Sequence, residues 1–204
     1  QILSGDDEAR LSFASAHSDF GRQGPLVVLD IGGGSTEFIF GDAAGAVGFR
    51  QSFQVGSVRL TERFIHTDPV SGSELEQLSA HLDQTFAALP DPPLGFTLVA
   101  VAGTATTVFA VARAIDPYDS TRVHGARIGF GEVLATAQRL SDVSLAQRQT
   151  FAGLQPKRAD VIVAGALILV RAMTRLGADQ VVVSDRGLRW GLPSQERGEL
   201  VLPA

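Results

Sequence analysis

The chain has 204 residues, of which 45% are hydrophobic and 19% charged, and its net charge is −5. This composition excludes a disordered chain, and the acidic balance argues against broad binding to nucleic acid or to an anionic membrane. There are no cysteines, which excludes disulfides, zinc ribbons and thiol nucleophiles and favours a reducing cytoplasm.

The predicted elements begin with a helix, because Ser4 is followed by acidic residues suited to a first helical turn. Buried or alternating strands are predicted at 26–31, 37–40 and 46–55. Their connections are too short for a crossover, so we expect an antiparallel meander.

The rest of the chain alternates helices with buried strands. In chain order we predict helices at 56–65 and from Ser71, a strand at 97–101, helices from Ala102, at 131–140 and at 156–176, a strand at 180–184 and a short helix at 187–192. This order predicts one α/β domain, a mixed five-stranded sheet flanked by helices. The longest apolar run, Val161–Val170, is about half the length needed to cross a bilayer.

A glycine-rich turn joins the first two predicted strands. Successive glycines allow several N–H groups to point into one concavity, as in anion-binding loops. Hydroxyl side chains follow them directly and can also bind phosphate. The candidate phosphate-binding residues of this turn are Gly32, Gly33, Gly34, Ser35 and Thr36.

Two carboxylates, Asp30 and Glu37, flank this turn. They would repel a bound phosphate unless a divalent cation such as Mg²⁺ lay between them, so we predict a metal site here. An ordinary glycine hairpin would not require an acid at the end of a buried strand. Glu37 also stands where a dinucleotide-binding fingerprint needs a glycine, and the sequence has no P-loop motif.

Further segments leave two interpretations open. Gly103 and Thr104 follow a strand at the start of a helix, where backbone donors could bind phosphate or simply cap the helix. Arg186 and Arg189 could contact phosphate or pair with surface acids, whereas Arg59 and Arg63 indicate a solvated helix face.

The acidic cluster Asp6, Asp7 and Glu8 could supply a general base for an attacking water. Acids in a first helical turn also stabilise the positive end of the helix dipole. On residue chemistry alone the second interpretation is favoured.

Taken together, the motifs resemble the exopolyphosphatase and guanosine pentaphosphate phosphohydrolase family. The resemblance covers nearly the whole chain to about Leu192 and is carried by six ordered segments: 3–9, 30–37, 56–62, 103–105, 158–160 and 184–191. It implies the ribonuclease H-like fold of actin, hsp70 and sugar kinases, in which two domains face each other across a cleft. It also implies that Glu8 is catalytic, that Asp30 and Glu37 contact the metal, and that the glycine turn holds phosphates.

The family's amino-terminal domain has no counterpart here, and the chain starts with Gln1. We therefore expect 1–192 to be the carboxyl-terminal domain of a two-domain phosphatase, with a polar tail at 193–204. The expected activity is Mg²⁺-dependent release of orthophosphate from the ends of polyphosphate, by a cytoplasmic enzyme that forms homodimers. The alternatives are hydrolysis of the 5′ phosphate of guanosine pentaphosphate, and a non-catalytic module that binds phosphate or dimerises.

Overall fold

The computed structural model describes residues 5–21 and 24–186, with side chains from Leu11 onward. Its centre is a six-stranded sheet in the order β3-β2-β1-β4-β6-β5. The predicted meander is confirmed. The strands β1 (Leu26–Ile31), β2 (Thr36–Gly41) and β3 (Val47–Phe53) lie side by side in chain order, each antiparallel to the next.

The other half of the sheet contains the predicted parallel strands and one strand that was missed. β4 (Thr97–Val101) lies parallel to β1, and β6 (Gln180–Val183) lies parallel to β4. The prediction of five strands was wrong, because β5 (Ala126–Gly129) pairs antiparallel with β6 at the sheet edge. This strand is too short to show an alternating pattern, and its backbone pairing with β6 makes it a strand.

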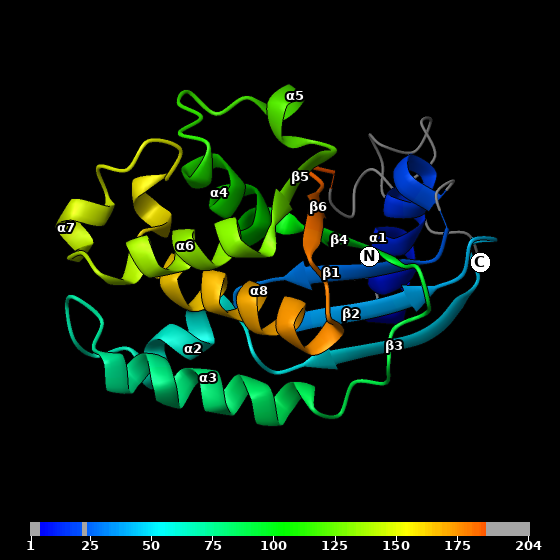
Figure 1. The fold of residues 1–204 in the computed structure, drawn as a ribbon, viewed down its shortest axis with the longest axis horizontal. Coiled ribbons are helices and arrows are strands. Elements are labelled where there is room, and N and C mark those ends of the chain that lie inside the picture. The colour runs from blue at the N-terminus through cyan, green and yellow to red at the C-terminus, as the bar shows by residue number, and fades with distance from the viewer. Residues whose placement is uncertain (1–4, 22–23, 187–204) are drawn as a thin grey trace.

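The helices form two layers of unequal size (Figure 1). Among the described helices, α1 (Gly5–Phe20) is the one that crosses the first face of the sheet. The opposite face is covered by helices of which α8 is the most central, and the full set is α2 (Ser57–Phe64), α3 (Gly72–Phe86), α4 (Ala102–Ala112), α6 (Phe130–Ser141) and α8 (Ile162–Leu176). Two short helices, α5 (Ser120–Val123) and α7 (Leu145–Arg148), lie in connections.

Alternating residues of the strands supply the two cores, as a period of two requires. Val27 and Leu29 face the large core beneath α8, whereas Leu26 and Val28 face the small core beneath α1. The predicted helix 156–176 is divided, because a 3₁₀ turn at Pro156–Arg158 precedes α8. Within the described ranges, no helix has the length and apolar character that crossing a membrane requires. The predicted helix at 187–192 and the tail lie outside these ranges.

Candidate functional site

The turns that follow two central strands lie together at the carboxyl ends of these strands. β1 and β4 are parallel neighbours, so the turns that follow them, at Gly32 and at Ala102, lie side by side. The buried Thr104 joins them, because its hydroxyl donates a hydrogen bond to the carbonyl of Ile31 at 3.1 Å. A buried hydrogen bond therefore joins the two segments singled out from the sequence.

The glycine turn is oriented by the start of α2. Ser57 N–H donates to the carbonyl of Gly32 at 3.0 Å, and Val58 N–H donates to that of Gly33 at 2.9 Å. The Arg59 side chain donates through Nε to the carbonyl of Gly34 at 2.8 Å. Arg59 is exposed, as interpreted from the sequence, and its side chain also braces the turn, which the sequence did not indicate.

These bonds determine where the amides of the turn point. In a trans peptide the carbonyl and the following N–H point in opposite directions. Because the carbonyls of Gly32, Gly33 and Gly34 point towards α2, the N–H groups of Gly33, Gly34 and Ser35 point away from it. A row of like-directed amides is the geometry of a backbone anion site.

Close packing makes glycine necessary beside this turn. A Cβ on Gly56 would lie 2.5 Å from the backbone of Gly33, so α2 could not begin this near the turn with any other residue. Thr36 is buried, and its hydroxyl donates to the carbonyl of Val55 at 2.6 Å. The hydroxyl thus anchors β2, and a contact between Thr36 and phosphate stays a prediction.

Asp30 and Glu37 lie directly opposite each other on β1 and β2. Both side chains are half-buried and lie on the face that α1 covers. Like charges at opposed positions of an antiparallel pair destabilise it, so this pair is suited to a shared cation. Glu37 also accepts a hydrogen bond from the Ser52 hydroxyl at 2.8 Å.

The donor set fits a magnesium ion that keeps much of its own water. No cluster of three or more His, Cys, Asp or Glu side chains suited to a metal occurs among the described residues. Mg²⁺ characteristically uses one or two carboxylates together with water and phosphate oxygens. Asp30 and Glu37 can provide the two carboxylates, and a phosphate in the glycine turn can provide the remaining oxygens.

At the second turn an arginine lies against a glycine. The Arg158 guanidinium occupies the space beside Gly103, where a Cβ would lie 2.3 Å from its nitrogens. Ala102 precedes it with a φ of 67°, a backbone conformation that L-residues adopt rarely and that clusters at functional sites. No sequence spacing connects Arg158 with Gly103, so the sequence indicates the arginine only as part of a segment that resembles the family.

A pocket of about 240 Å³ opens beside this turn and is lined by Gly103, Thr107, Tyr118, Arg158 and Asp185, among others. The Tyr118 hydroxyl donates to the Asp185 carboxylate at 2.6 Å. Burial and this carboxylate raise the pKa of Tyr118 above its ordinary value, which keeps the hydroxyl protonated. The pocket thus combines one cation with a fixed hydroxyl–carboxylate pair.

Two other predicted residues lie elsewhere. Arg186 pairs with Asp19 of α1 at 2.6 Å. Of the two interpretations of Arg186, the structure therefore shows an ion pair with an acid. Glu8 belongs to the first turns of α1, but its side chain lies outside the described part of the chain, as does all of Arg189. The catalytic role implied for Glu8 therefore stays a prediction.

Known proteins resemble this chain over most of its length. A model of the Ppx/GppA phosphatase family matches residues 1–197. Exopolyphosphatase 2 of Mycobacterium tuberculosis is 36% identical over 201 residues, which cover 94% of this chain and 62% of that protein. A bifunctional 3-dehydroquinate synthase/phosphatase of Fusobacterium nucleatum is 34% identical, with 90% of this chain and 28% of that protein covered.

Solved structures show the same similarity. A Ppx/GppA phosphatase of Aquifex aeolicus superposes with a TM-score of 0.88 at 28% identity, over 98% of this chain and 65% of that one. An exopolyphosphatase of Cytophaga hutchinsonii shares the fold, with a TM-score of 0.79 at 20% identity over 97% and 65% of the respective chains. This chain therefore spans 62–65% of three of these relatives and 28% of the bifunctional one.

Proposed function

The chain belongs to the Ppx/GppA phosphatase family, and on that premise we propose that it is the carboxyl-terminal domain of an enzyme that hydrolyses the terminal phosphoanhydride bond of inorganic polyphosphate. One observation carries the proposal. The amides of Gly33, Gly34 and Ser35 point together beside the opposed carboxylates Asp30 and Glu37. An anion site next to a cation site suits a phosphate chain with Mg²⁺.

Each part of the site has a defined task. The glycine-turn amides bind and orient the terminal phosphoryl group of the substrate. Arg158 and the Gly103 turn bind phosphates further along the polyphosphate. Mg²⁺ held by Asp30 and Glu37 would neutralise charge on the phosphates when bound. Phosphoryl transfer depends mainly on such positioning and charge stabilisation.

Water is activated by Glu8 in this proposal, a role that comes from the family resemblance. The carboxylate would orient the attacking water or accept its proton. Helix α1, on which Glu8 lies, packs against the same sheet face that carries Asp30 and Glu37. The general base and the metal pair therefore belong to the same side of the sheet.

The pocket beside Tyr118 favours guanosine pentaphosphate as a second candidate substrate. Tyr118 is 41% exposed beside the Arg158 guanidinium, so an aromatic ring lies next to a phosphate-binding cation. Aromatic rings stack with nucleobases. Inorganic polyphosphate has no group that would use such a ring.

The test is phosphate release by the enzyme with both domains present. We expect Mg²⁺-dependent release from long-chain polyphosphate, which Glu8→Gln lowers by at least about 100-fold. Asp83→Asn is the matched control, because Asp83 pairs with Arg171 far from the site, on the opposite face of the sheet. Normal release by Glu8→Gln would remove Glu8 from the mechanism.

Parallel assays with guanosine pentaphosphate decide between the two substrates. Calorimetry with a short polyphosphate addresses the third candidate, a non-catalytic module. Binding by the enzyme without turnover of either substrate would support the module, and the absence of both binding and turnover would refute the proposed function.

A further inference from the structure

We propose that Asp19 is a positioning residue, which fixes the orientation of α1, and thereby of Glu8, by joining the end of this helix to Arg186 and His124. The inference rests on the proposed function for its link to Glu8. The contacts at Asp19 lie wholly within the described residues.

The three side chains form a compact cluster, here called the Asp19 clasp. Asp19 is largely buried, at 16% side-chain exposure, and each carboxylate oxygen has a partner. Oδ1 lies 2.6 Å from Arg186, and Oδ2 lies 3.5 Å from Nε2 of His124. A charge-assisted hydrogen bond between a carboxylate and an arginine is stronger than a hydrogen bond between two neutral groups.

The partners of Asp19 are themselves held in place. The Ser184 hydroxyl lies 3.4 Å from Nδ1 of His124 and accepts from the N–H of Arg186 at 3.2 Å. The ring of Phe20 packs against His124 with the centroids 5.6 Å apart. Because Ser184 directly follows β6, the clasp ties α1 to the end of a central strand.

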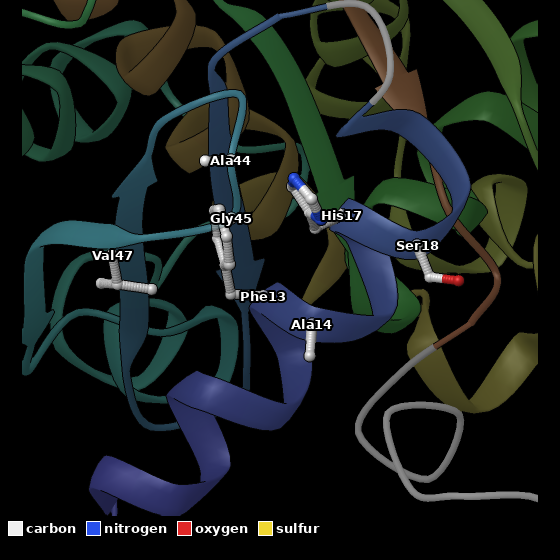
Figure 2. Close-up of a pocket in the computed structure, with 7 residues that line it drawn as sticks. All are labelled: Phe13, Ala14, His17, Ser18, Ala44, Gly45 and Val47. Carbon is white, nitrogen blue, oxygen red and sulfur yellow. The ribbon is translucent and has the colours of Figure 1, made fainter.

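Away from the clasp, the described part of α1 packs on the sheet through a few apolar side chains. Three described side chains of the helix, Phe13, Ala16 and Phe20, meet the small core on this face. Figure 2 shows Phe13 and His17 directed from α1 towards the turn between β2 and β3. An open hollow of about 570 Å³ lies between the helix and that turn, whereas Phe13 itself packs closely against Gly41 at the end of β2.

The helix geometry makes a small shift matter. Asp19 and Glu8 lie at opposite ends of α1, about 16 Å apart along a helix that rises 1.5 Å per residue. A tilt of about 4° at Asp19 would move the backbone of Glu8 by about 1 Å. A misplacement of that size can lower a rate by up to about 100-fold.

The decisive variant is Asp19→Asn in the two-domain enzyme. We expect kcat for polyphosphate to fall by at least about tenfold, with KM unchanged, because the glycine turn and Arg158 are untouched. Asp83→Asn, which removes a comparable aspartate–arginine pair from α3 and α8, should leave kcat as it is. An unchanged kcat in Asp19→Asn would overturn the proposal.

A double variant separates positioning from general damage. In a Glu8→Gln background, Asp19→Asn should cause no further loss of kcat, since the group that it positions is already gone. If the two losses multiply instead, Asp19 does not act through Glu8, and the inference is wrong.

A third measurement does not depend on activity. Hydrogen exchange of the amides in α1 should be roughly tenfold faster in Asp19→Asn than in Asp83→Asn, because a charge-assisted contact has been lost. Equal exchange in the two variants would overturn the clasp. If the wild-type enzyme hydrolyses neither substrate, the proposed function fails, while this measurement still decides whether Asp19 holds α1.

Discussion

Single residues of this site work through their backbone as much as through their side chains. The glycine turn offers amides because α2 and Arg59 bind its carbonyls, and Gly103 matters because it leaves room for Arg158. In both turns, the absence of a side chain allows another group to approach closely. A substitution can therefore disturb the site without removing any functional group.

Gly103→Ala tests this at the second turn. Its Cβ would lie 2.3 Å from the guanidinium of Arg158, which is the end of a flexible side chain and would be displaced from the pocket. We expect KM for polyphosphate to rise about tenfold, as for the loss of one charge-assisted contact, with a change in Tm of only a few degrees. Steady-state kinetics and thermal melts of the two-domain enzyme measure both.

Gly131→Ala is the matched control, because a Cβ there meets nothing within 4 Å. It should leave KM unchanged. If Gly103→Ala also leaves KM unchanged, Arg158 does not contact the substrate.

At the scale of elements, the start of α3 is fixed by local hydrogen bonds whose residues can be recognised in the sequence. The capping box predicted at Ser71 is present, and Glu74 completes it by accepting from the N–H of Ser71 at 2.9 Å. The same carboxylate accepts from the N–H groups of His66 and Thr67 and from the Thr67 hydroxyl. Glu74 therefore fastens the whole connection between α2 and α3.

These bonds, that from the Thr67 hydroxyl foremost, lower the pKa of Glu74 to about 2. A lowered folded-state pKa means that the stabilisation is present above the ordinary value of 4.5 and is lost as the pH falls from there towards 2. We expect Glu74→Gln to cost roughly 2–3 kcal/mol of unfolding free energy at pH 7. The difference from wild type should shrink steadily below pH 4.5.

Urea unfolding across this pH range measures the effect. Glu76→Gln alters an exposed acid on the same helix and should change stability by less than about 0.5 kcal/mol at any pH. A constant difference between Glu74→Gln and wild type from pH 7 to pH 3 would contradict the assigned role.

In the whole molecule, both turns and both carboxylates lie at the end of the sheet where the parallel strands β1 and β4 finish. Asp30 and Glu37 oppose each other across β1 and β2, and in the proposed function we expect a bound cation to relieve the repulsion between them. Functional sites commonly reduce the stability of a protein. Ligand binding should consequently be visible as a gain in the stability of the entire domain.

Mg²⁺ together with tripolyphosphate should raise the Tm of the chain by roughly 5 °C near saturation. Glu37→Gln should remove this response, because one of the two carboxylates is lost, and should raise the Tm slightly when no divalent ion is present. Glu62→Gln, an exposed acid on α2, should behave as wild type. Thermal shift assays decide the point, and a full response in Glu37→Gln would exclude Glu37 from the metal site.

The sequence by itself determined much of the fold and the two carboxylates that flank the glycine turn. The α/β class, the meander, the capped helix at Ser71 and the family were all correctly predicted. Hydrophobic periods, capping residues and glycine turns are local signals, readable within a few neighbouring residues. For the same reason the facing positions of Asp30 and Glu37 followed from a short connection between two strands.

Only the tertiary structure decided the features that join distant segments. β5 becomes a strand through its pairing with β6, and Arg158 enters the site by packing against Gly103, from a segment more than fifty residues away in the sequence. Arg59 was correctly assigned to an exposed face but its bond to the turn was not predicted, and Arg186 was left open between phosphate and an acid. Their partners, Gly34 and Asp19, come from other parts of the chain. Such contacts leave no periodic trace in a sequence, because they depend on how the strands and helices pack together.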